Sequence, residues 1–223
     1  KNVSGCFTNY SEVLCTELDF RTENGVVIYS SDAAKSYGEI ARKAIRTYAM
    51  VSSNLILIRD DVETKDDVIL HTNFHINNWD NELKYSAYKN TNCATLIRNH
   101  AAARLQEISC YINEEPGSNT FSNYWDIMHV NYHPLPNHKC QGVEGSSVAY
   151  KYATPKPARK FTALYAIILE DTTKLEAWSV EKHNSCITIT NGAASYEIKS
   201  DLKATIIKDN RKAEEILMFQ SKE

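Results

Sequence analysis

Glycine and proline are scarce in this sequence, whose 223 residues include seven glycines and five prolines. No glycines form Gly-x-Gly-x-x-Gly or Gly-x-x-x-x-Gly-Lys, the patterns whose backbone amides cradle phosphate groups. A Gly-x-Ser-x-Gly elbow, which exposes a nucleophilic serine, is also absent. The sequence therefore offers no motif for nucleotide chemistry or serine catalysis. We therefore predict no cofactor, and the absence of these motifs disfavours an enzyme without deciding the question.

A strong excess of one charge and a long apolar run are also missing. The net charge is −3 and the sequence pI is about 6.2, so nothing attracts the chain generally to nucleic acid or to an anionic membrane. No apolar run approaches the roughly 18 residues that a membrane-spanning helix needs. The sequence predicts neither a nucleic-acid partner nor a membrane span.

The cysteines and two sequence motifs favour the secretory pathway. Asn2 and Asn9 each begin an N-glycosylation motif, and the chain starts at Lys1, as expected after removal of a signal peptide. Six cysteines without a Cys-x-x-Cys pair favour three disulfides over zinc or a redox motif, with six buried thiols as the alternative. These are Cys6, Cys15, Cys93, Cys110, Cys140 and Cys186. We expect a secreted, extracellular, disulfide-bonded glycoprotein.

Hydrophobic periodicity predicts both helices and strands. Apolar residues from Tyr37 to Tyr48 recur at helical spacing, and similar patterns predict helices over about 95–108 and 210–219. Asn24-Gly25 between apolar runs indicates a hairpin, and the continuous apolar run 55–58 suits a strand buried on both faces. The charged segment 59–67 is interpreted as a loop. Further strands are predicted over 124–133, 147–153, 161–169, 175–182, 186–190 and 195–208.

The order of these elements predicts an α+β fold, with amphipathic helices packed on antiparallel sheets. We expect one compact body over 1–223, with sub-units over 17–92 and 93–223 that each place a helix before antiparallel strands. A helix followed by a wrapped antiparallel meander resembles cystatin-like folds, although the inhibitory Gln-x-Val-x-Gly signature is missing. The stretch from Tyr124-Trp125-Asp126 to Cys140-Gln141-Gly142 resembles the first hairpin of arthropod salivary lipocalins without their Gly-x-Trp opening. That resemblance implies, as an alternative, a calycin-like barrel in the second half.

One heptapeptide pattern occurs twice, as Ile69–His75 and Ile127–His133. In an extended strand, alternate side chains share a face, so the histidines would lie on one face and the apolar residues on the other. A metal site would need one histidine from each strand, because histidines four residues apart on a strand are separated by about 13 Å. The simpler interpretation leaves the imidazoles exposed and hydrogen-bonded to Asn73 and Asn131. The weak metal candidates are His71, His75, His129 and His133.

Tyrosine is abundant, with 13 residues, and it is favoured both in half-buried sheets and at contact surfaces. Weak candidates for contact with a ligand or partner are Tyr150, Tyr152 and Tyr165 on strands, and Lys156, Arg159 and Lys160 in a basic loop. The first function class is binding of another extracellular protein. The alternatives are a carrier of a small apolar ligand and a His-dependent or metal-assisted enzyme.

The two glycosylation motifs generate a direct prediction. Protein made in a secretory host should carry glycans at Asn2 and Asn9, because both motifs are accessible to the glycosylation machinery only in that pathway. Intact-mass measurement before and after glycosidase treatment should show a loss of mass, and Asn2→Gln with Asn9→Gln should abolish it. An unchanged mass would argue for a protein that does not enter the pathway.

Overall fold

The architecture is described from a computed structural model of the chain. It describes residues 15–78, 80–88, 92–117, 122–128, 147–174, 178–183 and 186–221. These residues form three antiparallel sheets, with a single 3-10 turn, η1 (Ala34–Tyr37), and no α-helix. The predicted α+β class is therefore wrong, and the fold is all-β.

The largest sheet, called sheet A, has nine strands in the order β1-β2-β3-β4-β12-β8-β7-β6, with β9 paired to β8. Its strands are β1 (Thr16–Glu23), β2 (Val26–Asp32), β3 (Ala41–Ser52), β4 (Leu55–Val68), β6 (Lys84–Tyr88), β7 (Cys93–Arg98), β8 (Ala101–Ile112), β9 (Glu115–Pro116) and β12 (Ala158–Asp171).

Two smaller sheets accompany it. Sheet B has the order β10-β11-β5, and sheet C is a meander from β13 to β17. Sheet B is built from β5 (His71–Asn77), β10 (Ser122–Met128) and β11 (Ser147–Ala153). Sheet C is built from β13 (Ser179–Lys182), β14 (Ile187–Asn191), β15 (Ala194–Ser200), β16 (Ala204–Asp209) and β17 (Glu214–Gln220).

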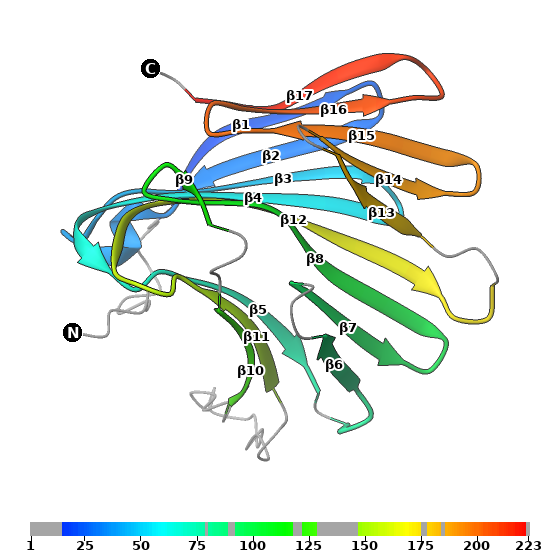
Figure 1. Cartoon of the computed structure of the whole chain (residues 1–223), viewed down its shortest axis with the longest axis horizontal. Helices are drawn as coiled ribbons and strands as arrows, with labels where there is room; N and C mark the ends of the chain where they lie inside the picture. Colours follow the sequence, from blue (N-terminus) through cyan, green and yellow to red (C-terminus); the bar gives the residue numbers. More distant parts are fainter. Residues whose placement is uncertain are drawn as a thin grey trace, which may run out of the picture.

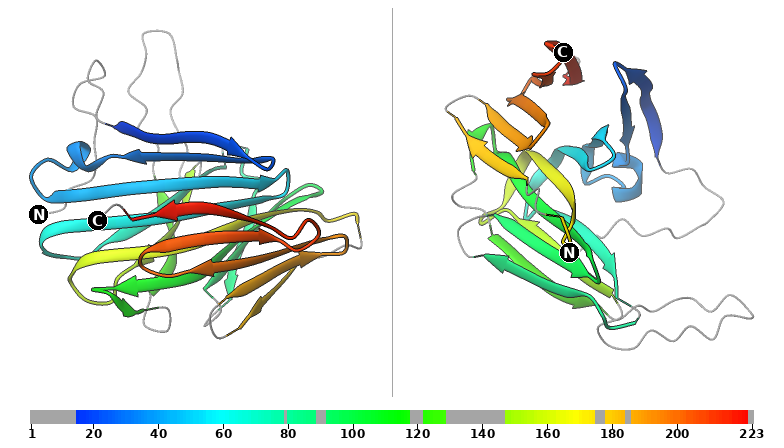
Figure 2. Two further views of the ribbon diagram at one scale, coloured as in Figure 1. Left: turned by 90° about the horizontal axis from the view of Figure 1, so that it is seen from above. Right: turned by 90° about the vertical axis from the view of Figure 1, so that its right-hand side faces the viewer.

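Sheet A is the middle layer, with sheet C on one face and sheet B on the other (Figure 1). Seen from above, the strands of sheet C lie over those of sheet A (Figure 2). One core cluster joins strands β2, β3, β4, β8 and β12 to sheet C, and a second joins β7, β8 and β12 to β5 and β11. The molecule thus has two hydrophobic cores separated by a single sheet.

Strand β12 contributes to both cores by alternation. Leu164, Ala166 and Ile168 face sheet C, whereas Phe161 and Tyr165 face sheet B. Because successive side chains of a strand point to opposite faces, a central strand between two layers is apolar at nearly every position. The strand predicted over 161–169 and the two-sided burial predicted for 55–58 are both confirmed.

The charged stretch after residue 58 continues strand β4 and is not the loop that we predicted. The Arg59 side chain is fully buried and donates to Asp61 Oδ2 at 2.9 Å, to the Leu202 carbonyl at 2.9 Å and to Thr205 Oγ1 at 2.8 Å. Its guanidinium carbon also lies 4.1 Å from the Phe219 ring centroid. This one cation therefore fastens sheet C to sheet A through hydrogen bonds and stacking.

The three predicted helices are all strands. Residues 41–52 form β3, residues 93–98 and 101–112 form the hairpin β7–β8, and residues 214–220 form β17. In β8 a register shift lies beside Ile108, so Leu105 and Cys110 both face sheet B although five residues separate them, while Ile108 faces sheet C. Such a bulge breaks the period of two, so the apolar residues of this segment do not show the regular alternation that predicts a strand.

The predicted units and barrel do not match the sheets either. Among the described residues, the strands of the second half are divided among three open sheets, and β12 pairs with β4 of the first half. The cystatin-like and calycin-like resemblances are thus not supported by the topology. No helix in this part of the chain is long and apolar enough to cross a membrane.

The predicted frame of three disulfides is not present. Cys15, Cys93, Cys110 and Cys186 are all free, and Cys6 and Cys140 lie outside the described residues. Three disulfides would require at least one bond among those four. Cys93 is paired in register with Gln106, four residues from Cys110 along β8, so the two buried thiols are held too far apart to bond.

We predict that Arg59→Met lowers the free energy of unfolding by about 3–5 kcal/mol, because it leaves the buried Asp61 carboxylate without its cation. Arg42→Met is the matched control, since Arg42 forms an exposed ion pair with Glu63 at 3.4 Å; an exposed pair contributes little. Urea unfolding followed by intrinsic fluorescence measures both variants. Equal losses in the two would show that Arg59 does not fasten the layers.

Candidate functional site

The outer face of sheet B carries the polar residues of the first His-containing strand. In β5, Thr72 is buried and Phe74 packs on the core, while His71 and His75 are exposed. This is the split between faces that the repeated pattern predicts for this copy. It follows from strand geometry, because the apolar residues of a sheet that covers a core must all point inward.

Strand β10, which ends with the first two residues of the second copy of the pattern, is not a neighbour of β5. Strand β11 lies between β5 and β10 and pairs antiparallel with both, so β5 and β10 run parallel to each other. His129 and His133 lie outside the described residues.

Three side chains from three strands meet on this outer face. The Tyr124 hydroxyl of β10 lies 3.4 Å from His71 Nδ1 of β5, and the Lys151 ammonium of β11 lies 5.9 Å from the Tyr124 ring centroid. Lys151 also forms an ion pair with Asp126 of β10. The register explains the meeting, because Lys151 is paired with Tyr124 on one side and Asn73 on the other. We call His71, Tyr124 and Lys151 the sheet B triad.

The surroundings of His71 favour the neutral form of its imidazole. Partial burial and the positive charge of Lys151 both lower the pKa of His71 below its ordinary value. A neutral imidazole next to a phenol can accept its proton or orient it. Beside the triad, the Asn73 carboxamide oxygen is buried and has no hydrogen-bond partner among the described residues.

This geometry gives no support to a metal site. Within the described ranges, no three His, Cys, Asp or Glu side chains gather closely enough to hold an ion. A neighbouring ammonium group also opposes cation binding at His71. The metal candidates on β5 are thus exposed histidines, one of which contacts a tyrosine.

The other predicted contact residues lie away from this face. Tyr150, Tyr152 and Tyr165 are each 0% exposed and belong to the core between sheets A and B. Arg159 and Lys160 belong to the start of strand β12 and not to the loop that we predicted, and both are paired, Arg159 with Asp67 at 3.1 Å and Lys160 with Glu114 at 2.5 Å. Lys156 is exposed in the turn between β11 and β12. The tyrosines consequently stabilise the interior.

The sequence analysis did not identify Glu107, a carboxyl group buried in that interior. It is 0% exposed, and neither oxygen makes a hydrogen bond of good geometry with another described group. Burial raises its pKa to about 7, and the nearby Lys182 and Asn92 offset only part of that effect. The signal in the sequence was that Glu107 is the single acidic residue of segment 93–112, between the apolar Leu105 and Ile108.

No family model matches the sequence, and no curated protein matches it either. Solved structures do share the fold. The heparan sulfate lyase HepC from Pedobacter heparinus matches with a TM-score of 0.59 at 13% identity, over 94% of this chain and 29% of that chain. A heparinase III matches with a TM-score of 0.55 at 10% identity, over 93% of this chain and 28% of that chain. At these identities the likeness concerns the fold alone, and the chain spans less than a third of these proteins.

Glu107 makes the stability of the protein dependent on pH. Its pKa is about 7 in the folded chain against an ordinary value of 4.5, so the folded state holds the proton more tightly. The stabilisation is complete below about pH 4.5 and is lost as the pH rises through 7, a change of about 3 kcal/mol.

The free energy of unfolding, measured by chemical unfolding at several pH values, should therefore change less with pH in Glu107→Gln than in the parent between about pH 5 and pH 7.5. Glu39→Gln is the matched control, because the Glu39 side chain is 98% exposed and should leave the slope unchanged. A slope that persists in Glu107→Gln would assign the pH dependence to other groups.

Proposed function

We propose that this chain binds an acidic polysaccharide along the outer face of sheet B. The observation that carries the proposal is the sheet B triad, which places an ammonium group, an imidazole and a phenol on one exposed surface. An ammonium group and an imidazole can donate to carboxylate or sulfate oxygens. The phenol ring offers an apolar face for a sugar ring.

The ion pair of Lys151 does not prevent such binding. The side chains of Lys151 and Asp126 are 18% and 44% exposed, and an ion pair that water reaches on the side of its carboxylate contributes modest free energy. An anionic group of the ligand can therefore replace Asp126 as the partner of Lys151 at small cost.

The extended shape of the surface suits a linear polymer. Residues of one strand that share a face repeat about every 7 Å, so His71, Asn73 and His75 form a row of polar groups along β5. The ligand class is supported by the solved structures that share this fold, two of which are a heparan sulfate lyase and a heparinase III. Because this chain spans less than a third of those proteins, we propose binding alone and no cleavage.

Binding of another extracellular protein stays a prediction, as do secretion and glycosylation. The tyrosines predicted for such a contact are buried. A surface suited to a protein partner is offered instead by edge strand β1, where Leu18 and Phe20 are 45% and 67% exposed. A small apolar ligand has less support, because no described observation favours it.

We expect heparan sulfate oligosaccharides to bind the parent chain at low ionic strength and to dissociate as salt is added, because exposed charge contacts are screened. Lys151→Gln should weaken binding about tenfold, which is the size of one charged hydrogen bond. His71→Asn should also lower the affinity for the oligosaccharide. Surface plasmon resonance on immobilised oligosaccharide measures both.

Two controls make this experiment decisive. Lys199→Gln removes a charge from sheet C, on the other side of sheet A, and should leave the affinity unchanged. Neutral dextran should not bind to the outer face. Equal weakening by Lys199→Gln, or no binding of the oligosaccharide to the parent, would contradict the proposal.

A further inference from the structure

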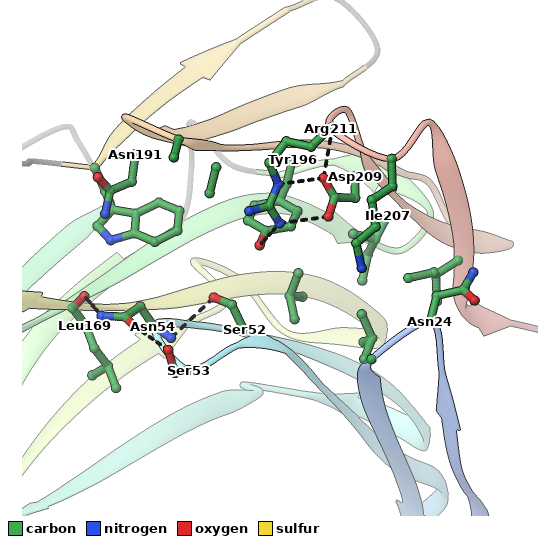
Figure 3. A pocket seen from close by; sticks show the side chains of 18 of the residues that line it. Asn24, Ser52, Ser53, Asn54, Leu169, Asn191, Tyr196, Ile207, Asp209 and Arg211 are labelled. Atoms are coloured by element: carbon green, nitrogen blue, oxygen red, sulfur yellow. Dashed lines mark hydrogen bonds and ion pairs between the residues drawn. The ribbon is translucent and has the colours of Figure 1, made fainter.

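A cavity lies between sheets A and C, separated from the sheet B triad by sheets A and B and the core between them. Its volume is about 490 Å³, which falls within the range of small-molecule sites. One wall is formed by the turns that follow β1 and β3, including Asn24 and Asn54, and the other by sheet C, including Tyr196 and Arg211 (Figure 3). The apolar residues of the core form its floor, among them Val26, Val51, Ile207 and Ile216.

Two polar atoms in the lining of this cavity have no described partner. The Trp178 side chain is buried, with the residue 5% exposed, and its indole Nε1 donates to no described acceptor. The Asn191 Oδ1 atom is also buried and accepts from no described donor. A buried polar atom without a partner costs about 1–3 kcal/mol, so such atoms require a water or a ligand.

Trp178 is fixed in its position by its surroundings. Its backbone amide donates to Glu170 at 3.1 Å, and its carbonyl accepts from Arg104 at 3.2 Å. Its ring stacks on Tyr196 with centroids 6.5 Å apart and an interplanar angle of 16°. The indole N–H is therefore held as a preorganised donor, which reduces the entropic cost of binding.

The charges of the lining nearly cancel. The cavity is lined by four carboxylates and three cationic side chains. Arg211 is already engaged, because it donates to both oxygens of Asp209, at 3.0 and 2.8 Å, and to the Tyr196 hydroxyl at 3.1 Å. An anionic or cationic ligand thus gains little here. The remaining groups are carboxamides and hydroxyls, which both donate and accept.

We propose that this cavity binds a neutral mono- or disaccharide, with Trp178 Nε1 donating to one sugar oxygen and Asn191 Oδ1 accepting from a sugar hydroxyl. A polyhydroxylated neutral molecule supplies both kinds of partner at once. The stacked aromatic rings and the apolar floor suit the carbon face of a sugar ring. The site does not depend on the sheet B surface, and its ligand is uncharged.

The test uses the three tryptophans of the chain, which give three indole N–H signals in a nitrogen-15 correlation spectrum. Trp178→Phe assigns the relevant signal. Cellobiose, lactose and chitobiose are each titrated into the parent chain up to millimolar concentrations. We expect a saturable shift of the Trp178 signal with at least one sugar. The Trp125 signal should not shift comparably, because Trp125 Nε1 also lacks a described partner but its side chain packs against the core between sheets A and B.

Variants at the cavity complete the test. Asn191→Ala should weaken the binding about tenfold by removing one hydrogen bond, and Asn123→Ala, on sheet B, should not change it. A Trp178 signal that none of the three sugars moves, or a shift that Asn191→Ala leaves unaltered, would overturn the proposal. The result is independent of heparan sulfate binding, since that experiment reports on Lys151 and His71.

Discussion

The pairing of β4 with β12 is the interaction on which the rest of the structure depends. Both strands have 14 residues, and their register runs from Leu55 opposite Ile168 to Glu63 opposite Lys160, with one further pair beyond a bulge. Because both strands are long, alternate side chains of each can pack against sheet C on one face and sheet B on the other. Sheets B and C do not pair with each other, so their relative position is set by how each packs on this central pair.

Sequence patterns were sufficient where geometry is local. Asn24 and Gly25 both have positive φ, 50° and 83°, as a two-residue hairpin turn requires, and the predicted hairpin is present. The strand around residues 161–169 was also predicted correctly. The segment 37–48 was not, because apolar residues stand on both faces of β3: Ala49 and Val51 pack towards sheet C, while Tyr48 and Met50 lie on the other, partly exposed face. Sheet pairing then decided the structure against an apparent helical period.

The candidate sites show a similar division. The polar face of β5 could be predicted because it depends only on alternation within one strand. The triad could not, since it requires β11 to lie between β5 and β10, and Lys151 is far from His71 in the sequence. Glu107 and Trp178 could not be recognised either, because their significance comes from burial by other sheets. Separation along the chain, more than residue type, limited what the sequence revealed.

The central pair also sets the order in which the fold can form. Ile58 and Tyr165 are neighbours in the sheet although more than one hundred residues separate them. During synthesis β4 can pair with β3 early, but its other edge waits for β12, and such non-local pairing is slow. Sheet C, by contrast, is a contiguous meander of neighbouring strands. The exposed edge of β4 is therefore the segment of the nascent chain most in need of protection from aggregation.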